Sequence, residues 1–309
     1  MILTISLNPA IDKTAICERL MPGQLNRLSG IQICPGGKGI NVSRALNCLG
    51  EKVCAMGFIG GGNGEYIKKE LEKSGIRTAF TNTGRGTRIN LNVISEDGFV
   101  TEILEPGPAP DVLCIEDFLG KYKKELKKTS LVVISGSLPE GMDNGFYAKL
   151  ITMAAEEKKR VILDSSGEPE RCGVEAIPYM IKPNLREFEY ILGRHFYEPE
   201  DIARAAGELV RRGIERVAVS LGSRGMVYVT PEVSLYAQAP RLNAINTVSC
   251  GDAAVAGFAY SLVRNLKDEE ALIKAVAVSA AAALSQESGL FLPDDESRFA
   301  GRITVSECT

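Results

Sequence analysis

Residues 246–256, which read NTVSCGDAAVA, carry the strongest chemical signal in the chain. A turn of small residues passes here into an alanine-rich segment of helical character, and Asp252 stands at the junction. The first amides of a helix lack partners within it and lie at the positive end of its dipole, so the junction favours an anion. A carboxylate repels phosphate, and Asp252 is better suited to take a proton from an attacking hydroxyl. An anion site beside a base predicts a phosphotransferase.

A second glycine-rich turn, residues 35–42 (PGGKGINV), leads into another helical pattern. Consecutive glycines let a ligand approach the backbone closely, and Lys38 and Asn41 add hydrogen-bond donors. The segment is not a Walker A loop, because no glycine precedes Gly37 by five residues and Gly39 follows Lys38. Ligand contact and a plain turn before a helix are both compatible with the local sequence.

Two further motifs follow strand-like runs. In KPNLRE (182–187), Asn184 and Glu187 have the spacing of a capping box, and the same pair could face phosphates and hold magnesium through water. Residues 219–225 (VSLGSRG) join two strands and predict either a simple turn or a close approach to a nucleotide.

Three polar residues lie at the ends of buried strands. Asp12 follows the first strand, Ser137 follows the run LVVIS, and Asp164 ends the run RVILD. Ligands of open parallel sheets bind at the carboxyl ends of strands, so these residues could line a cleft. Asp12 as a turn residue and Asp164 as the acid that enters the next helix are the alternatives.

The elements that must position these residues alternate along the chain. Short β-branched runs separated by amphipathic helical stretches predict a mostly parallel sheet covered on both faces, and residues 253–284 predict two packed helices broken near 265–268. Segments at about 12–34 and 88–104 interrupt this order, and the second predicts a hairpin turning at 96–98. Because a lone hairpin is unstable, we expect these segments to form a small sheet that covers the main domain as a lid, with an extension of the core sheet as the alternative.

Composition limits the possible classes of protein. The 309 residues carry a net charge of −3, which gives no general attraction to nucleic acid or to an anionic membrane surface. No apolar run is long enough to span a bilayer, the N-terminus does not read as a signal peptide, and the eight cysteines are scattered. We therefore expect one cytoplasmic domain over residues 1–309, with reduced thiols.

Taken together and in order, the motifs resemble those of the ribokinase-like (PfkB) carbohydrate kinases over nearly the whole chain. The matching stretches are NPAID (8–12), GGKGIN (36–41), TRIN (87–90), SGSLP (135–139), KPN (182–184) with Glu187, SLG (220–222) with Gly225, and Gly251-Asp252. The chain looks most like the phosphosugar branch of 1-phosphofructokinase and tagatose-6-phosphate kinase, on NPAID, on Asn26-Arg27, and on Thr101-Glu102 followed by PGP (106–108). The resemblance implies an α/β fold: a ribokinase-like three-layer sandwich with a mostly parallel central sheet and a small β-sheet lid.

The resemblance also implies a role for each motif. Asp252 would deprotonate the acceptor hydroxyl, and the transferred γ-phosphoryl group would be held by the amides of Ser249, Cys250 and Gly251. The residues expected around the sugar are Asp12, Gly36, Gly37, Asn41, Asn90 and Ser137. The cations expected at the phosphate already on the substrate are Lys38, Arg88 and Arg27. The residues expected around ATP are Lys182, Asn184, Ser220, Gly222 and Gly225, with Glu187 ordering Mg²⁺. A homodimer that meets through the lid is implied as well.

The expected reaction is transfer of phosphate from ATP to a ketohexose monophosphate, with fructose 1-phosphate as the first candidate substrate and tagatose 6-phosphate as the second.

Ser249-Cys250 replaces the Gly-Ala usual in this family, and serine would be strained if the first position needs a positive φ. A sugar-phosphate-binding protein without turnover therefore remains an alternative. So does a kinase of ribose or nucleosides, against which Lys38 and Arg88 argue, because a neutral sugar offers them no phosphate. Cys250, at a helix start, predicts a thiol of lowered pKa.

Overall fold

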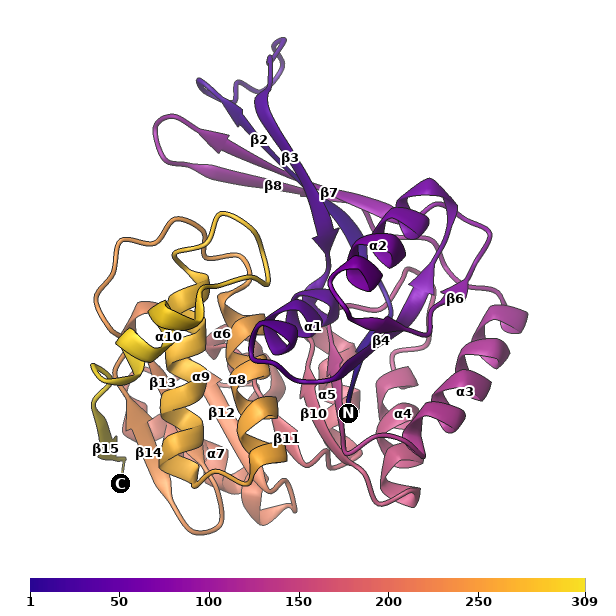
Figure 1. Cartoon of the computed structure of the whole chain (residues 1–309). Helices are drawn as coiled ribbons and strands as arrows, with labels where there is room; N and C mark the ends of the chain where they lie inside the picture. Colours follow the sequence, from indigo (N-terminus) through magenta and orange to yellow (C-terminus); the bar gives the residue numbers. More distant parts are fainter. Residues whose placement is uncertain (309) are drawn as a thin grey trace.

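The computed structural model describes residues 1–308 and contains a large and a small sheet (Figure 1). In the large sheet, β1 (Ile2–Ser6) lies between β4 (Val53–Ile59) and β9 (Leu131–Ser135). Beyond β9 it continues in parallel through β10 (Arg160–Asp164), β11 (Met180–Ile181) and β12 (Arg216–Ser220). Three antiparallel strands extend that side, β13 (Met226–Val229), β14 (Ser234–Ala237) and β15 (Val305–Glu307), while β5 (Arg77–Thr78) and β6 (Thr81–Asn82) pair with β4. The predicted mostly parallel sheet is confirmed.

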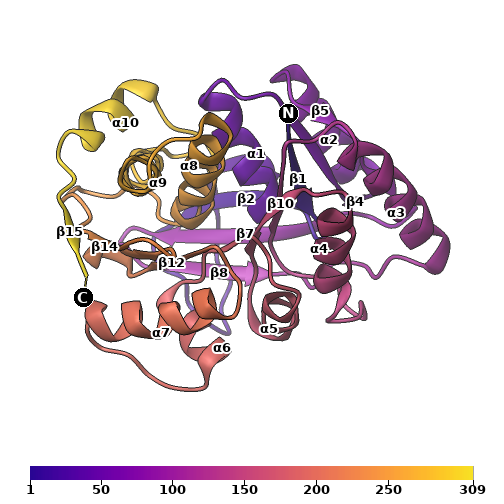
Figure 2. The ribbon, with the colours of Figure 1, turned by 90° about the horizontal axis from the view of Figure 1, so that it is seen from below.

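The central strands are mostly apolar because helices cover both faces of the large sheet. In β9, Leu131 and Val133 join one hydrophobic core, and Val132 and Ile134 join the other. The first core is completed by α1 (Lys38–Cys48), α2 (Gly61–Lys73), α8 (Cys250–Arg264), α9 (Asp268–Ala282) and α10 (Pro293–Ala300). The opposite core is completed by α3 (Val112–Leu126), α4 (Phe146–Glu156), α5 (Gly167–Glu175), α6 (Leu185–Leu192) and α7 (Pro199–Arg211) (Figure 2). The result is the expected three-layer sandwich.

The alanine-rich segment forms the predicted pair of helices. The chain leaves α8 at Asn265, which adopts a left-handed conformation with φ 53°, and enters α9 three residues later. The small side chains of both helices are buried against each other and against the sheet. Within residues 1–308, none of the helices has the length and apolar character needed to cross a bilayer.

The small sheet stands over the carboxyl ends of the parallel strands (Figure 1). It contains β3 (Ser29–Gly36), β2 (Ala10–Cys17), β7 (Arg88–Ser95) and β8 (Val100–Leu104) in that order. The predicted hairpin is β7–β8, and its turn is closed by the Gly98 N–H, which donates to Ser95. Because this sheet is separate from the large one, the alternative of a core-sheet extension is wrong.

Candidate active site

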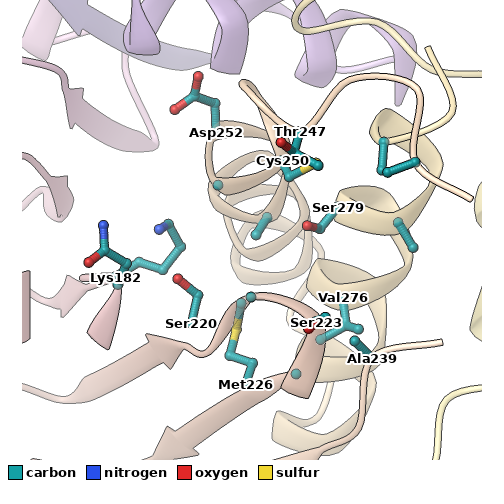
Figure 3. A pocket seen from close by; sticks show the side chains of 18 of the residues that line it. Lys182, Ser220, Ser223, Met226, Ala239, Thr247, Cys250, Asp252, Val276 and Ser279 are labelled. Carbon is teal, nitrogen blue, oxygen red and sulfur yellow. The ribbon is translucent and has the colours of Figure 1, made fainter. Parts of the chain in front are cut away.

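A cavity of about 630 Å³ opens where β10, β11 and β12 end, with α8 and α9 as its opposite wall (Figure 3). This volume lies within the range of small-molecule sites, roughly 300–1,000 Å³. The predicted residues that line it are Lys38, Lys182, Asn184, Glu187, Ser220, Gly222, Gly225, Cys250, Gly251 and Asp252. The structure therefore brings together motifs from both halves of the chain.

Asp252 lies in the first turn of α8 and is only 4% exposed. The Asn41 side chain donates a hydrogen bond of 2.8 Å to its carboxylate. Burial, followed by the negative charge of Asp164, raises the pKa of Asp252 to about 7, against the opposing charge of Lys38. A carboxylate with such a pKa is suited to accept a proton near neutral pH.

The amides at the start of α8 are partly free. The Cys250 N–H donates to Thr247 over 3.3 Å, and Ala253 is the first residue to bond back to Ser249. The amides of Gly251 and Asp252 have no hydrogen-bond acceptor among residues 1–308. Unpaired amides at a helix N-terminus can bind an anion, so the geometry supports an anion site beside the carboxylate.

Four charged side chains form a network on the other side of the cavity. The Lys182 ammonium lies 3.1 Å from the buried Asp164 carboxylate, and Lys38 lies 3.7 Å from Asp164 and 3.6 Å from Glu187. Burial opposes ionisation of Asp164, but Lys182 and Lys38 overcome it and hold its pKa below the usual value. Desolvation likewise opposes the charge of Lys38, yet these carboxylates hold the pKa of its ammonium above the usual value.

The contacts in this network bear on the sequence interpretation of two residues, Lys38 and Asp164. The structure places Lys38 among the carboxylates of the cavity, whereas the sequence interpretation assigned it to the phosphate already on the substrate. Asp164, left undecided between cleft and helix entry, lines the cavity and contacts both lysines. Its position at the end of a buried strand was the only available signal, because its partners are distant in sequence.

Glu187 serves local structure and faces the cavity. Asn184 accepts from the Glu187 amide at 3.0 Å and Glu187 accepts from the Asn184 amide at 2.8 Å, so the predicted capping box is confirmed. No three His, Cys, Asp or Glu side chains within the described chain are grouped to hold a metal. Mg²⁺ is often held by one or two carboxylates together with substrate phosphates and water. The second oxygen of Glu187, which faces Lys38, fits that mode.

The turn at 220–225 joins β12 to β13 through a single 3₁₀ turn over Gly222–Arg224. Gly225 has a φ of 116°, and a Cβ there would lie 2.0 Å from the carbonyl oxygen of Ala237. Sheet packing therefore requires this glycine, in addition to its place on the cavity wall.

The predicted sugar residues gather at the base of the lid. The Asn90 side chain donates to the buried Asp12 carboxylate at 2.9 Å, and burial, partly opposed by this bond, raises the pKa of Asp12. A Cβ at Gly36 would lie 2.1 Å from the Asp12 carboxyl carbon, so only glycine leaves room for this acid. Gly37 caps the start of α1, which carries Asn41 toward Asp252.

Of the remaining predicted residues, Arg88 and Ser137 both contact Asn8, and Arg27 lies apart from them. Arg88 donates three of its five N–H groups to the carbonyls of Asn8 and Glu105, which leaves two for a ligand. Ser137 accepts a hydrogen bond from the Asn8 side chain at 3.2 Å. Arg27 is exposed in the loop between β2 and β3. At about 3.3 Å per residue, that loop begins roughly 20 Å along the ribbon from Asp12, and Arg27 does not line the cavity.

The departure at Ser249-Cys250 is accommodated without backbone strain. Ser249 has a φ of −101°, so the left-handed conformation that would penalise serine is absent there. Burial, followed by the charge of Asp252, raises the pKa of the Cys250 thiol to about 11. The expectation of a lowered pKa is wrong, because burial and the neighbouring carboxylate both disfavour the thiolate.

Comparison with known proteins places this site in context. The model of the pfkB family carbohydrate kinases matches residues 4–295. The chain is 35% identical to a tagatose-6-phosphate kinase of Staphylococcus epidermidis, with 99% of this chain and 100% of the relative covered. It is 36% identical to a 1-phosphofructokinase of Bacillus subtilis over 94% of each chain. The solved structure of the tetrameric inhibited form of Escherichia coli phosphofructokinase-2 is similar with a TM-score of 0.90 and 31% identity, over 97% of this chain and 98% of that one.

Proposed function

The chain belongs to the pfkB family of carbohydrate kinases, and from this premise we propose that it uses ATP to phosphorylate a ketohexose monophosphate to a bisphosphate. Fructose 1-phosphate, phosphorylated at O6, is the first candidate. Tagatose 6-phosphate, phosphorylated at O1, is the second, because relatives of nearly equal identity carry the two names.

The observation that carries this proposal is the pairing of a buried carboxylate with free amides at the start of α8. Asp252 takes the proton of the acceptor hydroxyl as that oxygen attacks the γ-phosphorus of ATP. The free amides of Gly251 and Asp252 hold the oxygens of the transferred group, where negative charge must be stabilised. This set differs from the expected one of Ser249, Cys250 and Gly251, because the Cys250 amide already donates to Thr247. Phosphoryl transfer needs mainly this positioning and charge neutralisation.

The nucleotide occupies the cavity between the network and α8. Lys182, Asn184, Ser220, Gly222 and Gly225 line its binding site, and Lys38 lies where it can neutralise phosphate charge. Glu187 would hold Mg²⁺ through the oxygen that faces Lys38, together with water, and the ion would supply further charge neutralisation when bound.

The sugar lies between the cavity and the base of the lid. The residues that surround it are Asp12, Gly36, Gly37, Asn41, Asn90 and Ser137, and the two free N–H groups of Arg88 meet its phosphate.

The outer strands of the lid expose apolar side chains, among them Ile31, Ile33 and Ile103, and a second copy of this chain would bury them. This exposed apolar surface supports the homodimer.

The test is an ADP-release assay with fructose 1-phosphate, tagatose 6-phosphate, fructose 6-phosphate and ribose. We expect the highest kcat/KM with fructose 1-phosphate and little turnover with ribose, since a neutral sugar leaves Arg88 without a phosphate partner. Preference for tagatose 6-phosphate would select the second candidate. Preference for ribose would reject the phosphosugar assignment.

A further inference from the structure

The loop of residues 285–292, between α9 and α10, packs against the start of α8. The Gly289 N–H donates a buried hydrogen bond of 3.0 Å to the Ser249 hydroxyl. Ser249 is only 2% exposed and occupies the N-cap position of α8. The loop therefore binds the side chain that begins the candidate anion site.

The Ser249 hydroxyl does not cap its own helix. A serine at this position commonly accepts a hydrogen bond from the second or third amide of the helix, which here belong to Gly251 and Asp252. Ser249 instead has φ −101° and ψ 9°, outside the extended geometry of a capping serine, and its side chain makes no capping bond. The amides left free are those that a capping hydroxyl would occupy.

Gly289 is fixed from the opposite side by α1. A Cβ at Gly289 would lie 2.8 Å from the Cα and the carbonyl oxygen of Asn41, and its φ is +73°, so a larger residue requires a shift of the loop. Arg44 holds the same loop through the Ser288 carbonyl and through Glu287, 2.8 Å away. The position of the Gly289 N–H is thus set by the helix that also carries Asn41 to Asp252.

We propose that Gly289 is a positioning residue that keeps the start of α8 uncapped. Its N–H holds the Ser249 hydroxyl away from the amides of Gly251 and Asp252, which stay available to the transferred phosphoryl group. If the loop moves away, Ser249 is free to adopt the extended backbone geometry of a capping serine, and its hydroxyl then accepts from these amides and competes with the anion. The inference rests on the proposed phosphotransfer and adds a residue that acts through Ser249 and touches no substrate.

The test compares Gly289→Ala with the double variant Gly289→Ala/Ser249→Ala. Gly289→Ala should lower kcat about tenfold or more with a small change in the KM for ATP, because anion-site donors act mainly in the transition state. The double variant should recover much of this loss, because it has no hydroxyl to cap the helix. Ser285→Ala is the matched control, since the hydrogen bonds of that hydroxyl stay inside the same loop, and its kcat should equal the wild-type value.

A purely structural role for Gly289 predicts that the double variant is as slow as Gly289→Ala, and that result would overturn the proposal. Wild-type kcat in Gly289→Ala would overturn it as well. If Gly289→Ala does not fold, Arg44→Met releases the loop without a new side chain at 289, and the same rescue by Ser249→Ala is expected.

Binding of ADP with aluminium fluoride, a mimic of the transferred phosphoryl group, separates this inference from the substrate assignment. The affinity for this complex should fall in Gly289→Ala and recover in the double variant, while the affinity for ADP alone stays constant. A wild-type protein that binds the complex but phosphorylates none of the four sugars would contradict only the proposed substrate. Equal affinity in all variants would contradict the role of Gly289.

Discussion

The pH dependence of turnover tests the central assignment, because Asp252 must be ionised to accept a proton. A pKa of about 7 means that lowering the pH from 8 to 6 reduces its ionised fraction from about nine-tenths to about one-tenth. Turnover at saturating substrates should therefore fall about tenfold over this interval. The rate should level off above pH 8, where the carboxylate is fully ionised.

Asp252→Asn isolates the contribution of the base. Asparagine is nearly isosteric and can still accept the hydrogen bond from Asn41, so positioning is retained. The variant should bind ATP and the sugar phosphate normally, yet turn over about 10²–10⁴-fold more slowly. Its profile should keep only the ionisation of the substrate phosphates, so the ratio of wild-type to variant rates reports Asp252 alone. A ratio near one, or a ratio constant between pH 6 and 8, would refute the assignment.

The same carboxylate should lower the stability of the fold. Its pKa is raised from 3.8 in the native state, so the native protein binds more protons than the unfolded chain between about pH 4 and 7, and stability falls as pH rises through this window. Asp252→Asn should accordingly raise Tm at pH 8, by roughly 2–4 °C per kcal/mol recovered, and less at pH 4. A lower Tm of the variant at pH 8, measured by circular dichroism, would contradict this prediction, because it would mean that the folded protein stabilises the Asp252 carboxylate.

Three further substitutions probe the network and the cavity wall. Lys182→Met removes the nearer partner of the buried Asp164 and should lower the free energy of unfolding in urea by about 3–5 kcal/mol. A double variant that also carries Asp164→Asn should recover part of this loss, and an unchanged unfolding curve of Lys182→Met would contradict the pairing. Gly225→Ala should destabilise the protein by about 1–3 kcal/mol, because the carbonyl of Ala237 cannot move far without breaking the sheet; an unchanged Tm would contradict this. Glu187→Gln keeps an oxygen that can accept the capping hydrogen bond but loses the negative charge. The Mg²⁺ concentration that gives the half-maximal rate should therefore rise about 10–100-fold, while Tm changes little. An unaltered Mg²⁺ titration would show that Glu187 is not part of the metal site.

The elements with strong local signals could be predicted from the sequence. The alanine-rich pair of helices, the capping box at Asn184 and the hairpin of β7 and β8 all follow from spacing and turn residues. The parallel pairing of β2 with β7 and the closing strand β15 could not be predicted, because they join segments that are far apart in the chain. Such pairings depend on packing that no local pattern encodes.

The same division holds for the candidate site. Motifs ordered along the chain were enough to collect ten cavity residues, whereas the charges between them required three-dimensional positions. Lys38 lies among carboxylates because Asp164 and Glu187 converge on it from distant strands and helices. The pKa of Cys250 was mispredicted for the same reason: a helix start is visible in sequence, but burial and the neighbouring charge are not.

The groups that the proposed anion site offers at the start of α8 belong to the main chain, and this limits what side chains can reveal about related sequences. Serine and cysteine stand where the family usually has glycine and alanine, and yet the peptide N–H groups persist and the backbone is relaxed. Exchanges at these two positions are therefore a poor criterion for dismissing a homologue as a dead enzyme. A more informative question is whether its peptide chain still leaves these N–H groups unblocked.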